Sequence, residues 1–301
     1  MAVLNAKATE TRVLSKAQIE QFMELGHVTL PGAFPRKKAL AAQSLLWDRL
    51  TVRGIVQQDP RTWREPMVHL TETYDDPEFR ACDTERLADA IEDLVGPGRW
   101  RDRGQLVQWG WWPVNFSLGA DSPWSVPVSG WHWDGIHFRH TIDAPDQGIL
   151  ALCLFSDIGP RGGGTLVAEG SHKIVARFLH QYPSGLELGE AIPDCVRDHA
   201  WLAELTGAKP SADGDRIHRF MDSSFVDNKG TQLRVVETTG EAGDVILCHP
   251  LLFHAASQNH ARIPRFMCNR TAPLREPMRL DRSNGDYSPV EQSLRCAIGI
   301  E

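Results

Sequence analysis

The stretch Trp131-His132-Trp133-Asp134-Gly135 decides how the fold of this chain is interpreted. In an extended strand successive side chains point to opposite faces, so His132 and Asp134 share one face. An imidazole nitrogen and a carboxylate oxygen are then available to a single divalent metal ion. Such a pair also arises by chance, because a lone His or Asp near a strand end more often makes a turn or an ordinary polar contact. The pair therefore needs support from elsewhere in the chain.

His254 is the best candidate for a third ligand. It follows a strand-like run at 244–248 (DVILC) and the turn at 241–243 (EAG). Two histidines and one carboxylate on one face of a metal leave other coordination positions open, and this ligand set is typical of non-haem iron(II) oxygenases.

Arg265 adds a feature that a metal site alone does not need. It lies eleven residues after His254, on the next apolar strand, where a hairpin return would bring it back toward the metal. A guanidinium can form two parallel hydrogen bonds with the distal carboxylate of a keto acid that chelates the metal. The alternative interpretation is an ordinary surface arginine beside Arg262.

Four blocks in this order resemble the phytanoyl-CoA hydroxylase-like group of iron(II)/2-oxoglutarate-dependent oxygenases. They are the N-terminal helix and strand (19–22, IEQF, and 26–31, GHVTLP), His132-Trp-Asp134, the Gly-rich turn and strand at 162–173 (GGGTLVAEGSHK), and Gly243-Asp244 followed by His254 and Arg265. The resemblance runs discontinuously from Leu14 to Arg270.

This resemblance implies a mainly β fold with flanking helices around a double-stranded β-helix core, of the jelly-roll or cupin-like kind. It implies iron(II) bound by His132, Asp134 and His254, and 2-oxoglutarate anchored by Arg265. It also implies O2 as the second cosubstrate and ascorbate as an additive in vitro.

Two positions refine what the resemblance implies. The family often places a hydroxyl residue two positions after the distal histidine, but Ala256 stands there, and Ser257 is expected to substitute as a 2-oxoglutarate contact. Related halogenases carry Gly or Ala where this chain has Asp134, which opens a coordination position for halide. Asp134 therefore favours oxygen insertion or a related oxidation over halogenation.

Further candidates lie on the strands around these motifs. Asn115, on the strand that enters the site, is expected to contact cosubstrate or substrate. Most of the tryptophans between 109 and 133 are expected to fill the core. Trp112, Trp133 and His137 are assigned to the wall of a substrate pocket that suits a flat or apolar body.

Periodicity divides the chain into a mainly helical first hundred residues and a strand-rich remainder. Helices are expected from Ser15, after Pro35 and over about 83–95, with a strand at 27–30. Later apolar runs predict antiparallel strands at 106–112, 148–155, 164–168, 233–237, 244–248 and 265–271. No linker separates two halves, so we expect one oxygenase domain over 1–301, with 1–13 flexible and about 174–227 as an insertion that forms a lid.

Composition bounds the partners and the compartment. The 301 residues include 32 Lys and Arg against 39 Asp and Glu, a net charge of −7, which argues against nucleic acid or an anionic membrane as a partner. The polar N-terminus and the absence of long apolar runs predict neither a secretory signal nor a bilayer span. Six scattered cysteines without a C-x-x-C pair suit reduced thiols, so a cytoplasmic location is expected. The sequence carries no signal for oligomeric state.

Together these features predict an oxygenase that hydroxylates or otherwise oxidises a C–H bond of a small metabolite, such as a natural-product intermediate, and releases succinate and CO2. The competing interpretation is a cupin-like metal-binding protein or isomerase that does not use 2-oxoglutarate. Arg265 discriminates between the two, because such a protein has no need of a guanidinium at that position.

Overall fold

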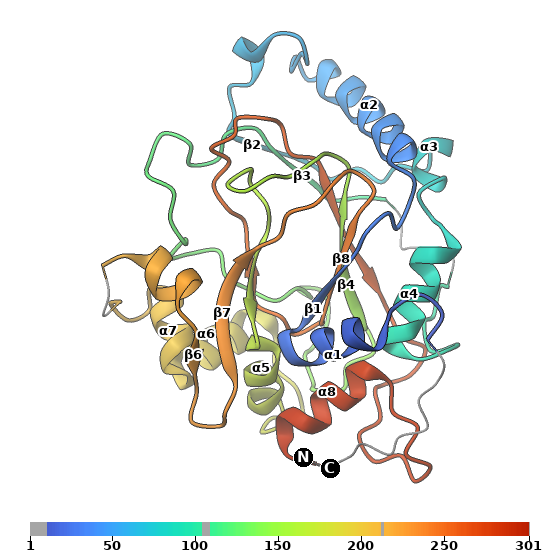
Figure 1. Cartoon of the computed structure of the whole chain (residues 1–301), viewed down its shortest axis with the longest axis vertical. Coiled ribbons are helices and arrows are strands. Elements are labelled where there is room, and N and C mark those ends of the chain that lie inside the picture. The colour runs from blue at the N-terminus through green and yellow to red at the C-terminus, as the bar shows by residue number, and fades with distance from the viewer. Residues whose placement is uncertain (1–10, 104–108, 212–213, 301) are drawn as a thin grey trace.

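Two four-stranded antiparallel sheets form the centre of the protein (Figure 1), in a computed structural model that describes residues 11–103, 109–211 and 214–300. The first sheet has the order β1 (His27–Leu30), β8 (Val245–Cys248), β4 (Ile149–Leu154) and β10 (Met267–Ala272). The second has the order β6 (Phe225–Val226), β7 (Gln232–Glu237), β5 (Leu166–Glu169) and β9 (His254–Ala255). This pair of sheets is the jelly-roll core, so the expected fold class is confirmed.

A separate two-stranded ribbon extends the first sheet. Its strands β2 (Met67–Leu70) and β3 (Trp112–Asn115) pair antiparallel. A backbone bridge between Asn115 and Arg265 attaches the end of β3 beside the segment that leads into β10. The ribbon therefore lies along one side of the sheet that carries the predicted cosubstrate anchor.

β4 shows why the core strands read as nearly continuous apolar runs. Leu150, Leu152 and Leu154 belong to an inner cluster that also contains Val167 of β5. Their neighbours Ile149, Ala151 and Cys153 belong to the larger outer cluster, which includes residues from the helices. Because both faces of the strand are covered, polar residues cannot alternate with apolar ones along it.

Helices cover the outside of the sheets (Figure 1). They are α1 (Lys16–Leu25), α2 (Arg36–Val52), the 3-10 turn η1 (Pro60–Thr62), α3 (Pro77–Arg80), α4 (Glu85–Val95), α5 (Ser171–Leu179), α6 (Leu188–Asp198), α7 (Ala200–Leu205), the π-helical turn η2 (His218–Asp222) and α8 (Pro289–Ile298). None of the helices in the described ranges is long and apolar enough to cross a membrane.

The strongest local signals in the sequence form the elements they predict. Ser15 caps α1 in a capping box with Gln18, and the chain leaves that helix through Gly26 at a positive φ of 87°. The third helix begins at Glu85 and is capped by Thr84. The strand expected at 106–112 lies partly outside the described residues, and β3 begins only at Trp112. Of the N-terminal stretch expected to be flexible, 1–10 lies outside the described residues, whereas the backbone N–H groups of Arg12 and Val13 donate to Asp93.

Candidate metal and cosubstrate site

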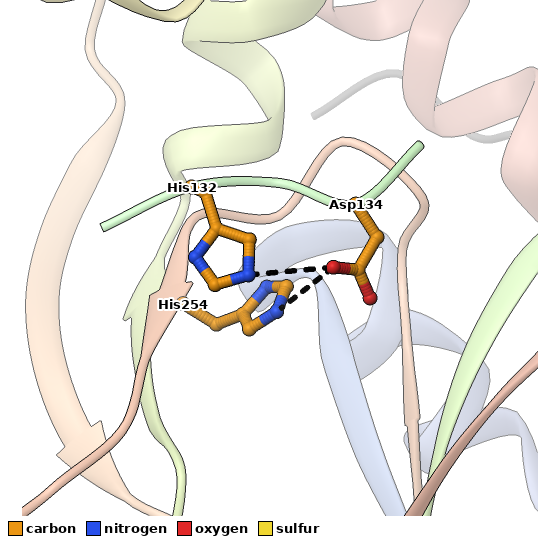
Figure 2. A group of neighbouring side chains, drawn as sticks. All are labelled: His132, Asp134 and His254. Carbon is orange, nitrogen blue, oxygen red and sulfur yellow. Dashed lines mark ion pairs between the residues drawn. The ribbon is translucent and has the colours of Figure 1, made fainter. Parts of the chain in front are cut away.

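Three side chains from two distant parts of the chain converge at one point (Figure 2). His254 begins β9, and His132 pairs with it through two backbone hydrogen bonds of 3.0 and 2.8 Å. Asp134 Oδ1 lies 3.3 Å from His132 Nε2 and 3.7 Å from His254 Nε2. One ligand atom from each residue lies within 4.8 Å of the other two. This spacing suits a single metal ion, and within the described ranges it is the one such group of three or more His, Cys, Asp or Glu residues.

Backbone carbonyls set the tautomer of both histidines. His132 Nδ1 lies 2.8 Å from the carbonyl oxygen of Gly130, and His254 Nδ1 lies 3.1 Å from that of Leu252. A carbonyl can only accept, so each Nδ1 carries the proton and each Nε2 keeps a free lone pair. His254 Nε2 is buried and has no hydrogen-bond partner in the described ranges, which is costly unless a ligand fills the position.

The electrostatics of His254 and Asp134 favour the protonation states that bind a metal, whereas at His132 burial lowers the pKa but the hydrogen bond to Asp134 and the charge of that carboxylate outweigh it and raise the pKa. Burial lowers the pKa of His254 and so favours its neutral imidazole. Burial alone would raise the pKa of Asp134, but the charges and hydrogen bonding of the two histidines hold it below its ordinary value. A neutral imidazole and an ionised carboxylate are the forms that coordinate a divalent cation.

Arg265 lies in the same cavity as these three residues. Its side chain is buried, and neither Nε nor Nη1 has a hydrogen-bond partner in the part of the chain that the structure describes. Burial lowers the pKa of Arg265 to about 10, so the guanidinium stays charged at neutral pH. A buried cation without a counter-charge is unfavourable, and an anionic ligand in the cavity would satisfy it.

The comparison with protein families supplies the deciding observation. The phytanoyl-CoA dioxygenase (PhyH) family matches residues 68–267, about two thirds of the chain. The chain belongs to the phytanoyl-CoA dioxygenase family. A search of curated proteins finds no match.

Solved structures with a similar arrangement of elements are distant in sequence. HygX from Streptomyces hygroscopicus, with nickel and 2-oxoglutarate bound, is 17% identical over 86% of each chain, with a TM-score of 0.46. EctD from S. alaskensis, with 2-oxoglutarate and 5-hydroxyectoine, is 17% identical over 89% of this chain and 79% of its own, with a TM-score of 0.48. The carbocyclase SnoK from nogalamycin biosynthesis is 14% identical over 87% and 85%, with a TM-score of 0.49.

Membership of the phytanoyl-CoA dioxygenase family makes this protein an iron(II)/2-oxoglutarate-dependent oxygenase. The residues of the cavity fit both cofactors. Two free imidazole lone pairs and a carboxylate suit iron(II), and a buried unpaired guanidinium suits a dicarboxylate.

The cavity that contains these groups has a volume of about 730 Å³. It is lined by residues of the β2–β3 ribbon (Met67, His69, Trp111, Pro113), the loop after Asp134 (135–138), the segment before β4 (Asp146, Gln147), and inward-facing residues of the core strands, among them Thr165, Met267, Asn269 and Thr271. The space is large enough for a cosubstrate and a small substrate together.

Two of the sequence-predicted contacts are not among the residues that line the cavity. Ser257 Oγ donates to the carbonyl of Gly164 at 2.6 Å and contacts Glu237, which uses the hydroxyl within the protein. The amide of Asn115 donates to the carbonyl of Ser257 and accepts from the N–H of Leu118. Both side chains fix the loop that follows β9, and the hydroxyls on the cavity wall belong to Thr165 and Thr271 instead.

The aromatic assignments are corrected in the same way. Trp112 is fully buried and packs against Phe155 and Phe79 in the outer core. Trp133 is fully buried against Phe253, on the face of its strand opposite to that of His132 and Asp134. His137 does line the cavity, and the tryptophan on the wall is Trp111. Because Trp112 faces the outer core, alternation along the strand would place its neighbour Trp111 on the cavity face. The sequence alone does not decide this, because the backbone at Trp111 interrupts the alternation.

The segment at 174–227 contributes no described residue to the cavity wall. It forms most of α5, then α6, α7, η2 and β6. In this conformation the structure gives it no contact through which to act as a lid.

Proposed function

We propose that this protein hydroxylates a C–H bond of a small metabolite, with iron(II) held by His132, Asp134 and His254 and 2-oxoglutarate held by Arg265. The observation that supports the proposal most directly is that candidate metal ligands and a candidate anion-binding residue face one cavity. Two imidazole Nε2 atoms and a carboxylate face the same cavity as a buried guanidinium that lacks a counter-charge. A metal-binding isomerase would need the first feature and not the second.

Bound iron and 2-oxoglutarate supply the oxidising power, because conversion of the keto acid to succinate and CO2 activates O2 for attack on a C–H bond. The residues of the chain bind and orient. Gly130 and Leu252 hold the imidazole rings so that each Nε2 is free. Arg265 would hold the distal carboxylate of the cosubstrate, which would leave its keto-acid end free to chelate the metal held by the three ligands.

Asp134 supports oxygenation over halogenation. Its carboxylate oxygen lies between the Nε2 atoms of the two histidines, where it occupies the position that related halogenases leave open to halide. We expect oxygenated product from the wild-type protein even in high chloride. A chlorinated main product would contradict this assignment of Asp134.

The test separates metal binding, cosubstrate binding and turnover. Under anaerobic conditions, iron(II) protein is titrated with 2-oxoglutarate and the visible charge-transfer band of the chelate is followed. O2 and ascorbate are then added with a panel of metabolites, and succinate and the mass of the product are measured. Metal binding without the chelate band would favour the cupin-like isomerase instead.

Variants assign the ligands. Asp134→Ala should lose most of its iron and all coupled succinate formation while remaining folded. The matched control is Asp48→Ala, at an exposed position on α2, which should keep both. Full iron content and full activity in Asp134→Ala would refute the proposed ligand set.

A further inference from the structure

Trp111 presents a large apolar surface to the cavity. Half of its surface is exposed, and its ring lies 5.2 Å from that of His69 on the neighbouring strand of the ribbon. Both residues line the cavity that contains the metal ligands. An exposed tryptophan on a cavity wall offers a flat face for stacking and for contact with a cation.

The backbone is strained in order to place Trp111 there. Trp109 and Trp112 both pack into the outer core, where their rings are 6.2 Å apart and each contacts Phe155. In a regular strand, residues three positions apart point to opposite faces, so one residue between them must break the alternation. Trp111 does so with a φ of 63°.

That conformation is unfavourable for a side chain with a Cβ, and glycine adopts it freely. Gly110 is adjacent, yet the positive φ falls on the tryptophan. Strain of this kind persists where the side chain has a role, and here the side chain enters the cavity.

A second part of the cavity wall is also apolar. Ile136 is 76% exposed, and Phe138 follows two residues later in the loop that leads away from Asp134. Both residues line the cavity. Exposed apolar side chains on the wall of one cavity form a surface that water covers poorly and an apolar body covers well.

Charge on the cavity wall is acidic beyond the cofactor positions. Asp146 is an exposed residue of the cavity wall, and its carboxylate makes no hydrogen bond or ion pair with any other residue that the structure describes. Among the described residues, Arg265 is the one Lys or Arg on the wall. With Asp134 and Arg265 assigned to the metal and the cosubstrate, a phosphate or carboxylate on the substrate would find no lysine or arginine among the described wall residues, whereas a protonated amine would find Asp146.

We infer that the mouth of the cavity is a substrate subsite for a small molecule with a flat apolar body and a protonated amine, stacked on Trp111 and paired with Asp146. This inference rests on the proposed function, because it assigns the substrate class of the same site. It makes Trp111 and Asp146 residues that determine specificity, and it disfavours substrates that carry phosphate.

Three probes of one size test the charge. They are 2-phenylethylammonium, 2-phenylethanol and 3-phenylpropionate, titrated by saturation-transfer NMR into the full-length protein with iron(II) and 2-oxoglutarate under anaerobic conditions. The amine should bind best, the alcohol more weakly and the acid least. Equal binding of all three, stronger binding of the acid, or binding of none would overturn the inference.

Two variants localise the probe. Asp146→Asn should weaken the amine by about two- to fivefold and leave the alcohol unchanged, since a partly exposed ion pair has an effect of this size. The matched control is Asp48→Asn on α2, which should change neither. Loss of alcohol binding in Asp146→Asn, or no change in amine binding, would contradict the assignment of Asp146.

Trp111→Gly separates a binding role from a structural one. Glycine relieves the strain at positive φ, so the variant should unfold at the same temperature as wild type or a higher one, while it loses affinity for the amine and for the alcohol. A structural tryptophan would give a lower unfolding temperature with unchanged affinity, and that result would overturn the inference. Trp111→Phe should retain part of the affinity.

Failure of the proposed function and failure of the subsite give different results. The chelate band reports bound iron and 2-oxoglutarate in every sample that contains metal, and the same probe titrations are repeated on metal-free protein. Loss of the band with the probe order intact refutes the proposed function and leaves the subsite. An intact band with the wrong probe order refutes the subsite alone.

Discussion

Single residues in this cavity carry buried polar atoms that a ligand would satisfy. His254 Nε2 and two guanidinium nitrogens of Arg265 are buried without hydrogen-bond partners among the described residues. An unsatisfied buried polar group costs about 1–3 kcal/mol, and a charged one costs more. Arg270 also has buried nitrogens without partners, but it does not line the cavity, whereas these three atoms belong to residues of one cavity wall that a metal and an anion can reach.

Arg265 gives the prediction that belongs to this scale. A charged hydrogen bond contributes about 1.5–3 kcal/mol, so Arg265→Ala should weaken 2-oxoglutarate by at least about tenfold. Arg265→Lys should fall between, because lysine keeps the charge and loses the paired geometry. Iron affinity should be nearly unchanged in both. The measurement is the anaerobic titration of 2-oxoglutarate, followed by the chelate band.

Two other arginines, one on each side of Arg265 in the sequence, can be compared with it. Arg262 is exposed and pairs with Asp121, and Arg270 lies over the ring of Trp109, 4.1 Å from its centroid, away from the cavity. Arg262→Ala should therefore keep wild-type affinity for 2-oxoglutarate. Unchanged affinity for 2-oxoglutarate in Arg265→Ala, or a loss of that affinity in Arg262→Ala, would contradict the assignment of Arg265 as the residue that binds the distal carboxylate.

Sequence reasoning at this scale is strongest where chemistry limits the residue type. His132, Asp134, His254 and Arg265 could be proposed from the sequence because metal binding and anion binding admit few side chains, and the structure brings all four to one cavity. Ser257 and the aromatic wall were not predictable, because a hydroxyl or an indole serves the core as well as a pocket. Only the backbone at Trp111 decides which tryptophan faces the cavity.

At the scale of elements, the loop that carries His132 and Asp134 is fixed by Trp133 and His140. The indole N–H of Trp133 donates to His140 Nδ1 at 3.1 Å, and His140 Nε2–H donates to the carbonyl of Gly135 at 2.8 Å. His140 is in turn paired through its backbone with Leu186 of the long insertion. The turn on which both ligands sit is thus tied to the insertion.

Removal of this tie should weaken metal binding. Trp133→Phe keeps the ring against Phe253 but loses the donor, and His140→Phe loses both bonds. We expect cobalt(II) affinity to fall by about tenfold, with altered visible bands of the bound metal, since outer hydrogen-bond partners have effects of this order. The control is Trp201→Phe, a buried tryptophan on α7 whose indole N–H has no recorded partner. A lower unfolding temperature with wild-type cobalt affinity and spectrum would show that the tie stabilises the fold alone.

The insertion at 174–227 holds the ligand loop from a second point. Arg216 Nε donates to the carbonyl of Val126 at 2.8 Å, and its Nη2 donates to those of Pro127 and Leu205. One guanidinium therefore joins the end of α7 to the approach of the metal loop. If the insertion acts as a brace, loss of this contact should weaken metal binding. If the insertion acts as a lid, metal binding should not change.

Arg216→Met distinguishes the two roles. A brace predicts weaker binding of iron(II), because the segment that leads to His132 loses two hydrogen bonds, those that its Val126 and Pro127 carbonyls accept from Arg216. A lid predicts unchanged iron affinity with more uncoupled succinate and relaxed substrate choice. The comparison uses iron affinity and the ratio of succinate to product, with Arg197→Met, at an exposed position on α6, as the control.

At the scale of the whole molecule, the parts predictable from sequence are those with strong local codes. The capping box at Ser15 and the apolar run at 148–155 specify α1 and β4 without help from other segments. β9 contains two residues and exists only because its backbone pairs with β5 and with His132. The contacts between the insertion and the metal loop could not be predicted from the sequence either. Side chains that donate hydrogen bonds to distant backbone carbonyls produce no periodic pattern in the sequence.

Stability of the whole molecule should carry an unusual pH dependence through Asp83. Burial raises the pKa of Asp83 to about 6, although the charge of Arg270 and a hydrogen bond from Trp109 act in the opposite direction. In the unfolded chain an aspartate has a pKa of about 4. Between these values the folded protein binds more protons than the unfolded chain, so this residue makes stability fall as pH rises from about 4 to about 6.

Asp83→Asn isolates this contribution. Asparagine resembles the protonated carboxyl in size and can still accept from Trp109 Nε1 through its carbonyl. Near pH 4 the variant and the wild type should therefore have similar unfolding temperatures. Above pH 6 the variant should be the more stable by an increment that no longer changes, because the wild type has then ionised a buried group. Thermal unfolding of metal-free protein across pH 4–8 measures the difference, with Asp48→Asn as the exposed control. A difference that does not vary with pH would show that Asp83 is already ionised at acidic pH and that Arg270 outweighs its burial.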